Sequence, residues 1–220
     1  MELNSIIDFT LLKPETTEND IHAFCMLARK YNFYACAVTS VHVAQVVREL
    51  KNTGIKVCCA VGFPLGAMLS SVKAYEAKCA LDAGADEIDM VIQIGALKSG
   101  QEDKVLQELI QVRDITKNHI FKVILENCLL NKEEIIRGCQ LAVEAGADYV
   151  KTSTGFLGKG ACEEDIRLMK ETVNGKALVK ASGGIKTLDQ AMKLVEAGAS
   201  RLGISSAVEI MNEYAHRRNQ

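Results

Sequence analysis

The chain has 220 residues, of which 48% are hydrophobic and 25% are charged, and its formal net charge is −2 at pH 7. These proportions are typical of a soluble globular protein. The near-neutral balance gives no electrostatic reason to expect nucleic acid or an anionic membrane as a partner. The length suits a single α/β barrel, so we expect one domain that spans residues 1–220.

The cysteines and the N-terminal sequence indicate the cellular setting. MELNSIIDF lacks the basic and apolar segments of a secretory signal peptide. The longest apolar stretch, VCCAVGFPLGAML, is interrupted by glycine and proline and is too short to span a bilayer. The eight cysteines form no CxxC motif, and their spacings match no common zinc site. We therefore expect a cytoplasmic protein with no membrane partner, whose thiols are reduced and mostly buried.

Strand-like segments follow one another along the chain, most of them separated by an amphipathic helical pattern. They cover residues 5–12, 34–39, 56–62, 87–93, 121–126, 149–154, 177–182 and 201–205. Three helical patterns end at Gly84, Gly146 and Gly198, where glycine is expected as a left-handed helix cap. Strands that alternate with helices indicate βαβ units and a parallel sheet. The sequence therefore predicts an α/β fold of the (β/α)8 TIM barrel type, with a doubly wound open sheet as the structural alternative.

Charged residues share one face of several predicted strands. Side chains alternate along a strand, so Ile7 and Phe9 lie on one face and Asp8 on the other. The apolar faces are needed to pack against the amphipathic helices, so the charged faces are expected to line the barrel interior. The residues predicted to point inward are Asp8, Asp89, Lys122, Lys151 and Lys180.

Two interpretations of this charged cluster are open. Barrel interiors are usually packed with apolar side chains, so buried charges require either mutual pairing or a chemical task. A structural ion-pair network satisfies the first requirement. The location of the charges near the C-terminal ends of the strands, where barrel enzymes build their active sites, favours the second.

Lys151 and Lys180 lie on consecutive predicted strands, so their ammonium groups can approach to roughly 5–7 Å. At about 6 Å and an effective dielectric near 20, two such charges repel by about 2.8 kcal/mol, or about two pKa units. Burial lowers the pKa of a lysine further. One lysine then becomes a free amine that attacks a carbonyl group. The spacing does not identify which one, and Asp89 is placed either to move protons or to hold Lys180 charged.

Three clusters of glycine, serine and threonine follow the last three predicted strands: TSTGF (152–156), SGGIK (182–186) and GISS (203–206). Turns of this composition expose backbone N–H groups that bind anions. The loops after strands seven and eight of a barrel often hold phosphate, and they contain Gly183, Gly184, Ser205 and Ser206. No Walker A or GxGxxG motif is present, which favours a small sugar phosphate over a nucleotide.

Six segments together resemble the deoxyribose-phosphate aldolase family. They are VGFPLGA (61–67), ADEIDMV (85–91), KVILE (122–126), VKTSTGF (150–156), VKASGGIK (179–186) and GISS (203–206). The resemblance runs from IDFTLL (7–12) over nearly the whole chain. It implies a class I aldolase on a (β/α)8 barrel that needs no metal or other cofactor. Such an enzyme reversibly cleaves 2-deoxy-D-ribose 5-phosphate to D-glyceraldehyde 3-phosphate and acetaldehyde.

The resemblance also implies roles for individual residues. Lys151 would form the Schiff base, Lys180 would perturb its pKa, and Asp89 would carry the proton relay. The residues expected to bind substrate are Asp8, Lys122, Thr152, Ser153, Gly155, Gly183, Gly184, Ser205 and Ser206. The partners implied are a sugar phosphate and an aldehyde, and the expected assembly is a homodimer or a higher homo-oligomer.

Some positions depart from the family pattern. The second strand reads ACAVTS (35–40) where a Cys-Val-Asn-Pro-like run is frequent, and ENC (126–128) stands where Glu-Thr is common. The C-terminal tyrosine of some members has no counterpart in HRRNQ (216–220). Two alternative functions are open: a class I aldolase with another sugar-phosphate or aldehyde substrate, and a non-catalytic barrel that binds a sugar phosphate.

Overall fold

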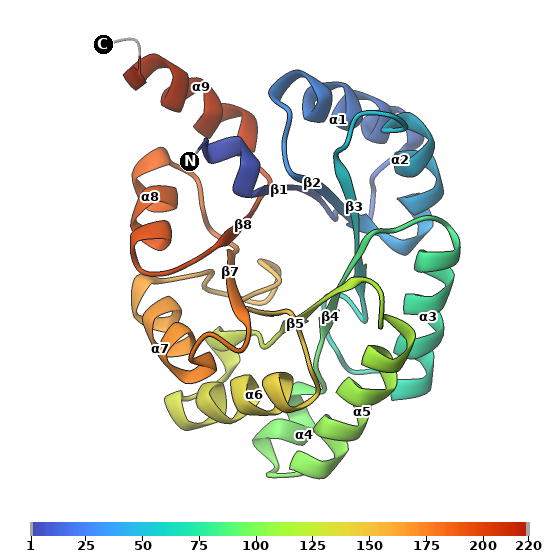
Figure 1. Ribbon diagram of the computed structural model, residues 1–220, viewed down its shortest axis with the longest axis vertical. Helices are drawn as coiled ribbons and strands as arrows, with labels where there is room; N and C mark the ends of the chain where they lie inside the picture. The colour runs from blue at the N-terminus through green and yellow to red at the C-terminus, as the bar shows by residue number, and fades with distance from the viewer. Residues whose placement is uncertain (1, 219–220) are drawn as a thin grey trace.

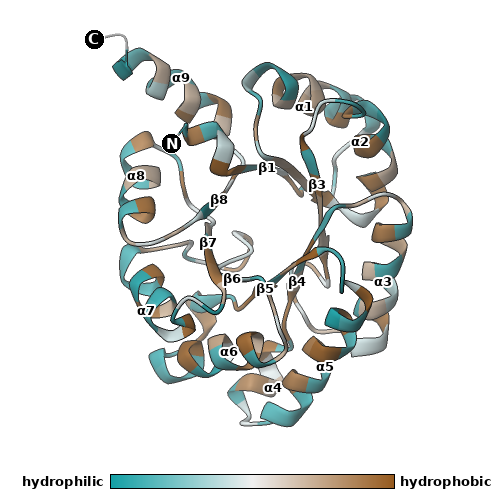
Figure 2. Ribbon diagram, in the orientation of Figure 1, coloured by the Kyte–Doolittle hydropathy of each residue, from teal (hydrophilic) through white to brown (hydrophobic). Residues whose placement is uncertain are grey.

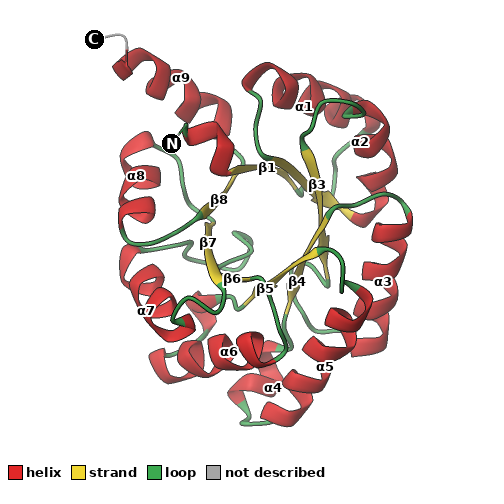
Figure 3. Cartoon of the chain, in the orientation of Figure 1, coloured by secondary structure: helices red, strands yellow, loops and turns green. Residues whose placement is uncertain are grey.

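The structure is a computed structural model that describes residues 2–218, and its eight strands form one closed parallel barrel (Figures 1 and 3). The strands are β1 (Ile7–Leu11), β2 (Ala35–Thr39), β3 (Lys56–Val61), β4 (Glu87–Val91), β5 (Ile120–Ile124), β6 (Tyr149–Lys151), β7 (Leu178–Ser182) and β8 (Arg201–Ile204). Each strand pairs with the next in the chain, and β8 pairs with β1. This closure confirms the predicted (β/α)8 TIM barrel and rules out the open sheet.

The helices surround the barrel, as Figure 1 shows. They are α1 (Glu18–Tyr31), α2 (Val43–Glu49), α3 (Ser70–Asp82), α4 (Ile94–Lys98), α5 (Glu102–Ile115), α6 (Lys132–Glu144), α7 (Glu163–Val173), α8 (Leu188–Glu196) and α9 (Ala207–Arg218). The predicted caps are confirmed, because Gly84, Gly146 and Gly198 follow α3, α6 and α8 with φ of +100°, +79° and +118°. These glycines turn the chain sharply from each helix into the next strand.

Two predicted strands, 5–12 and 149–154, are each three residues shorter in the structure, and the other strands differ from the prediction by one or two residues at their ends. Residues 3–6 form a 3-10 helix, η1 (Leu3–Ile6), so β1 begins only at Ile7. Strand β6 ends at Lys151 rather than at residue 154. The reason is that Gly155, at φ +83°, turns the chain away, and the carboxylate of Glu126 accepts the Thr154 N–H at 3.1 Å. The segment after Lys151 is therefore a loop at the barrel mouth.

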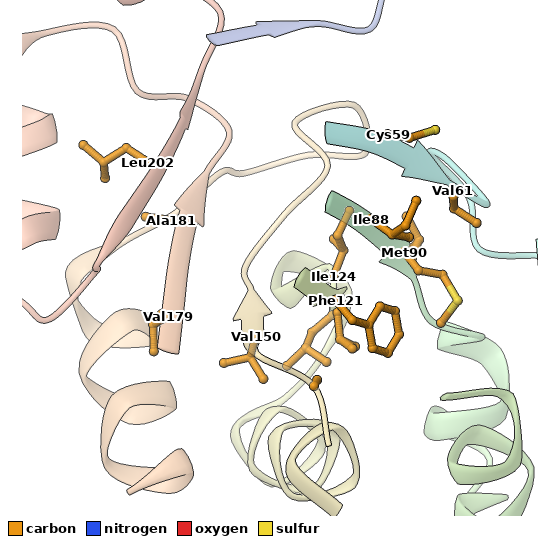
Figure 4. Packing of buried hydrophobic residues seen from close by; sticks show 14 of the residues in the cluster. Cys59, Val61, Ile88, Met90, Phe121, Ile124, Val150, Val179, Ala181 and Leu202 are labelled. Atoms are coloured by element: carbon orange, nitrogen blue, oxygen red, sulfur yellow. The ribbon is translucent and has the colours of Figure 1, made fainter. Parts of the chain in front are cut away.

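The main apolar core lies between the strands and the helices. Figure 2 shows hydrophobic residues on the strands and on the helix faces turned toward them. Figure 4 shows part of this layer, in which Met90, Phe121 and Val150 come from the adjacent strands β4, β5 and β6. All three are fully buried, and each such side chain contributes about 1.5–3 kcal/mol of transfer free energy. The outward faces of the strands are thus apolar, which leaves the inward faces for other side chains.

The cysteines are free thiols, and most of them are buried, as expected. Five are buried, namely Cys25, Cys36, Cys58, Cys59 and Cys139. The other three are exposed: Cys79 lies on the outer side of α3, Cys128 in the short 3-10 helix η3 (Asn127–Leu129), and Cys162 immediately before α7. Within residues 2–218, no helix is both long enough and apolar enough to cross a membrane.

A buried ion pair joins α3 to α5 behind strand β4. The Nζ atom of Lys73 lies 2.8 Å from Oε1 of Glu108, and both side chains are completely buried. Lys73 also donates to the carbonyl of Val91 at 2.8 Å, and Glu108 accepts the N–H of Gln93 at 2.9 Å. The pair therefore ties both helices to the C-terminal end of β4, the strand that carries Asp89.

We expect Lys73→Met to lower the free energy of unfolding by about 3–5 kcal/mol, because it leaves the Glu108 carboxylate buried without its cation. The measurement is urea denaturation followed by circular dichroism. The matched control is Lys78→Met on the same helix, where the ion pair with Asp82 is exposed and its loss should hardly change stability. Equal effects of the two substitutions would contradict this account of the buried pair.

The first and last described segments lie side by side (Figure 1). The guanidinium of Arg218 in α9 lies 2.7 Å from the carboxylate of Glu2, just before η1. Tyr31 of α1 donates from its hydroxyl to the Asn212 side chain at 2.8 Å. These contacts place α9 against the start of the chain and close the outer ring of helices.

Candidate active site

The five residues predicted to point into the barrel all do so. Asp8, Asp89, Lys122, Lys151 and Lys180 are buried, and they form ion pairs with one another. Part of the space that they occupy is left by a glycine, which has no side chain. A Cβ atom added to Gly203 would lie 3.2 Å from Cε of Lys180, so this glycine on β8 leaves room for the lysine stem.

Asp89 holds the two lysines that the sequence singles out. Its Oδ2 atom lies 2.8 Å from Nζ of Lys151 and 2.7 Å from Nζ of Lys180. Since both nitrogens contact one oxygen, they are closer together than twice the longer distance, which confirms the predicted proximity. Strands β6 and β7 place Lys151 opposite Lys180 in register. Lys180 also pairs with Asp8 on β1, whereas Lys151 has Asp89 alone as its ion-pair partner among the described residues.

The part of the cluster away from the cavity contains two residues that were not among those predicted to point inward, Glu87 and Arg201. Lys122 lies 2.5 Å from Oε2 of Glu87 and 2.6 Å from Oδ1 of Asp89. The guanidinium of Arg201 lies 2.8 Å from Oδ1 of Asp8 and 3.4 Å from Oε2 of Glu87. Both missed residues share strand parity with inward residues, since Glu87 is two positions from Asp89. That parity is the signal that would have identified them.

The surroundings of the two lysines shift their pKa values in opposite directions. Burial is the main influence on Lys151 and lowers its pKa, the Asp89 carboxylate opposes this, and the Lys180 charge adds a smaller lowering. For Lys180, burial is outweighed by Asp8 and Asp89, so its pKa lies above the ordinary value. Lys151 is therefore the side chain that tends toward a free amine, and Lys180 stays an ammonium. The sequence prediction that Lys180 is the chief cause requires correction, because removal from water has the larger effect.

The two aspartates of the cluster, Asp8 and Asp89, have lowered pKa values and are ionised. Burial raises the pKa of Asp89, but Lys122, Lys151 and Lys180 together hold it well below the usual range. Cys58, which donates from Sγ to Oδ1 of Asp89 at 3.1 Å, has its pKa raised to about 12 by burial. At neutral pH the cluster thus contains charged carboxylates and a neutral thiol.

A cavity of about 570 Å³ opens at the C-terminal ends of β1, β6, β7 and β8. This volume suits a small ligand. Of the charged cluster, Lys151 alone lines the cavity, with Asp89 and Lys180 behind it. A larger hollow of about 700 Å³ lies between the β3–α3 loop and α4, but Lys104 is its single charged lining residue. We therefore assign the site to the cavity that Lys151 reaches.

The structure divides the residues expected to bind substrate into two groups. Those that line the cavity are Gly155, Gly183, Gly184, Ser205 and Ser206. Those that are buried and do not line it are Asp8, Lys122, Thr152 and Ser153. Asp8 and Lys122 are used in ion pairs inside the barrel, and Thr152 bonds with its hydroxyl to the carbonyl of Ser182 at 3.1 Å. These four therefore lie behind the residues that line the cavity, and their contact with substrate stays a prediction.

The glycines at the cavity mouth allow backbone to pack on backbone. A Cβ atom added to Gly160 would lie 1.9 Å from the carbonyl oxygen of Gly183. One added to Gly183 would lie 3.1 Å from Cα of Gly160 and 3.2 Å from Cα of Gly155. With Ser205 and Ser206 preceding the N-terminus of α9, this arrangement brings turn amides and a helix dipole to one end of the cavity. Such an end suits the phosphate group of a ligand.

Two cationic side chains at the cavity rim were not identified from the sequence. Lys13 follows β1 and Lys186 follows β7, and both line the cavity. Each adds positive charge near the glycine-rich end, while Glu209 on α9 adds one negative charge. Lysines in loops are common on any surface, so the sequence alone carries no signal that separates these two from the rest.

Asp8, Cys58 and Asp89 bring potential metal-ligand atoms within 4.8 Å of one another. Their acceptor atoms already contact ammonium groups, since Lys180 pairs with Asp8 and Asp89. Lys122 contacts both Asp89 and the Cys58 sulfur. A divalent cation would have to displace buried lysine charges, so the donor set does not fit a metal.

The closed barrel, its C-terminal cavity and the lysine at the cavity floor define a TIM-barrel enzyme. The family model for DeoC/LacD family aldolase matches residues 6–211, and the chain belongs to this family of aldolases.

Individual relatives agree with this assignment. The chain is 50% identical over 219 residues to a protein of Mycoplasma capricolum named deoxyribose-phosphate aldolase, covering 100% of this chain and 99% of that protein. A solved aldolase called QR15 superimposes with a TM-score of 0.95 at 40% identity, covering 99% of this chain and 98% of that one. A tetrameric deoxyribose phosphate aldolase from Aeropyrum pernix has a TM-score of 0.90 at 34% identity, covering 97% and 91%.

Proposed function

We propose that this chain is a class I aldolase that reversibly cleaves 2-deoxy-D-ribose 5-phosphate to D-glyceraldehyde 3-phosphate and acetaldehyde. The observation that carries the proposal is Lys151, whose buried amine has a lowered pKa and faces the cavity. The name shared by relatives about 50% identical over the full chain supports the choice of substrate.

The proposed reaction begins with Lys151. Its free amine attacks C1 of the open-chain sugar, and loss of water gives a protonated imine. The Asp89 carboxylate, which accepts a hydrogen bond from the Lys180 ammonium, removes the C3 hydroxyl proton through a water molecule. This breaks the C2–C3 bond and releases the glyceraldehyde phosphate. The imine takes up the electron pair as an enamine. Protonation and hydrolysis then release acetaldehyde and restore the amine.

The protein contributes charge placement to these steps. Asp89 contacts both Lys151 and Lys180 through the same oxygen, so one carboxylate serves the reacting amine and is held in place by the Lys180 ammonium. General acid–base assistance of this kind contributes about 10²–10⁴-fold to rate. The glycine-rich end of the cavity, with Gly183, Gly184 and Ser206, would hold the phosphate away from the reacting carbons.

Trapping of the imine tests the proposal. We expect incubation with acetaldehyde and borohydride to add an ethyl group to the Lys151 peptide, detected by mass spectrometry. A substrate assay with 2-deoxy-D-ribose 5-phosphate should then release glyceraldehyde 3-phosphate. An ethylated Lys151 without cleavage of this sugar would identify a class I aldolase of another substrate. Absence of an adduct at every lysine would leave a sugar-phosphate-binding barrel and overturn the proposal.

We expect Gly183→Ala to raise KM for the phosphorylated sugar about 10–100-fold, because the added Cβ meets the Gly155 and Gly160 backbone and displaces the phosphate end. The value of kcat/KM for unphosphorylated 2-deoxyribose should change little. Gly175→Ala is the matched control, since Gly175 also has positive φ, at +76°, but has open space around it. If kcat/KM fell equally for the phosphorylated and the unphosphorylated sugar, the phosphate would not bind at this end of the cavity.

We also infer that residues 1–220 act as one domain and assemble as a homodimer or a higher homo-oligomer in the cytoplasm. The family match over residues 6–211 and the tetrameric relative from Aeropyrum pernix support this inference. Light scattering coupled to size exclusion would measure the assembly, and a monomeric mass would refute it.

A further inference from the structure

Six charged side chains in the barrel interior form a closed ring of alternating sign. In order around the ring they are Asp8, Lys180, Asp89, Lys122, Glu87 and Arg201. Each acid contacts two bases, and each base contacts two acids. The ring draws on β1, β4, β5, β7 and β8, and we call it the charge ring.

The charge ring is electrically balanced by itself, because its three carboxylates match its two ammonium groups and one guanidinium. Lys151 is the seventh charged group, and it contacts the ring only at Asp89. A protonated Lys151 gives the buried cluster one surplus positive charge, whereas a neutral Lys151 leaves it balanced. A surplus charge is costly in a buried, poorly solvated site. The cluster is therefore balanced when one of its bases is neutral. Lys151 is the base that loses its proton, because it contacts one carboxylate, whereas Lys122 and Lys180 each contact two.

Other groups around Lys151 leave this balance intact. It faces Asp89 on β4, Lys180 on β7 and Cys58 on β3, and the Cys58 thiol is neutral at neutral pH because burial raises its pKa to about 12. Lys122 on β5 and Asp8 on β1 are next to these groups within the ring. The remaining charged groups that share its cavity are Lys13, Lys186 and Glu209. These lie at the cavity rim, where solvent screens them.

Arg201 and Glu87 are the members of the charge ring that lie away from the Lys151 amine, on the opposite side of the ring from Asp89 and Lys180. Neither lines the cavity, and among residues 2–218 no ion pair or hydrogen bond joins either of them to Lys151. Arg201 is fixed in place, because its guanidinium lies 3.6 Å from the ring centroid of Tyr34 and donates to the Tyr149 hydroxyl at 3.2 Å. Glu87 has one oxygen, Oε1, without a hydrogen-bond partner.

We propose that Glu87 and Arg201 are positioning residues that set the protonation state of Lys151 from a distance by closing the charge ring. The inference rests on the proposed function of Lys151 as the imine-forming amine. It predicts that substitutions of the two residues shift the pKa of Lys151 in opposite directions. Removing the negative charge of Glu87 drives the Lys151 proton off more easily, and removing the positive charge of Arg201 retains it.

The test is the pH dependence of reductive trapping at Lys151. The amine and acetaldehyde form an imine and water, and cyanoborohydride supplies the hydride that converts the imine to an ethylamine. The rate of ethylation is measured by mass spectrometry across a pH series. We expect Glu87→Gln to move the midpoint of the profile about one pH unit toward acid, and Arg201→Met to move it about one unit toward alkali. The double variant, whose ring is again balanced, should return to the parent midpoint.

The controls separate charge from structure. Arg201→Lys keeps the charge but loses the guanidinium stacking, so its midpoint should stay near that of the parent. If Arg201→Met does not fold, Glu87→Gln and the double variant still test the inference, because the second substitution must reverse the first. Shifts in the same direction, or no shift in a folded Glu87→Gln variant, would overturn the role of the ring. A parent protein that forms no adduct would instead overturn the proposed function, so the two failures are distinguishable.

Discussion

Lys151→Met should reduce cleavage of 2-deoxy-D-ribose 5-phosphate to the background rate, a loss of about 10⁴-fold or more. The substitution removes the amine that forms the imine while it keeps most of the side-chain volume at the cavity floor. Borohydride trapping with acetaldehyde should then give no adduct on any other lysine. Lys151→Arg is the matched control, since it keeps a cation beside Asp89 but offers no nucleophilic amine at neutral pH. It should be as inactive as Lys151→Met.

The same variant should fold and should have a different dependence of stability on pH. In the folded protein the pKa of Lys151 is lowered, mainly by burial, whereas in the unfolded chain the pKa of a lysine side chain is about 10.4. Between these two pH values the unfolded state binds one more proton, so this side chain makes the free energy of unfolding rise with pH. Lys151→Met should remove that rise, which urea denaturation at several pH values would measure. A variant that keeps the full rise would show that Lys151 is not the amine with the lowered pKa.

Lys180→Met should reduce the rate at pH 7 by about 10²-fold and shift the activity optimum toward alkaline pH by about two units. Removing this ammonium removes repulsion at Lys151 and leaves Asp8 and Asp89 with one fewer cation, so the pKa of Lys151 rises. A higher pKa means less free amine at neutral pH, and raising the pH restores it. The measurement is kcat/KM across a pH series.

Lys180→Met should also destabilise the fold by about 3–5 kcal/mol, because two buried carboxylates lose a partner. Lys180→Arg, which preserves the charge, is the control that separates loss of charge from loss of shape. Its activity optimum should stay close to that of the parent protein. An unshifted pH profile in a folded Lys180→Met variant would rule out an electrostatic role for Lys180.

The sequence predicted the barrel and the centre of the site because both depend on short-range patterns. Strand parity is a local property, so Asp89, Lys122 and Lys151 could be assigned to the interior before any coordinates were considered. The same parity would have identified Glu87, two residues before Asp89. Arg201 shares its face of the short strand β8 with Gly203, so this strand has no second charged residue that would mark an inward polar face.

Other features depend on closure of the barrel and could not be predicted. Burial is the leading cause of the lowered pKa of Lys151, and burial is known only once all eight strands surround it. The end of β6 at Lys151 follows from the hydrogen bond between Thr154 and Glu126, two residues that are far apart in sequence. That bond moves Thr152 and Ser153 out of the strand pattern. Strand parity therefore applies only as far as Lys151 and does not define where the next two side chains point.

The contact between Glu2 and Arg218 means that the chain can be reconnected in a different order. A short linker between these neighbouring ends and a new opening at the exposed turn of residues 117–118, between α5 and β5, would give a circularly permuted protein. Every strand would keep its two partners, and Lys151 would keep the same surroundings. Catalysis should survive such a rearrangement, because what the site needs is the closed cylinder and not the point at which synthesis of the polypeptide starts.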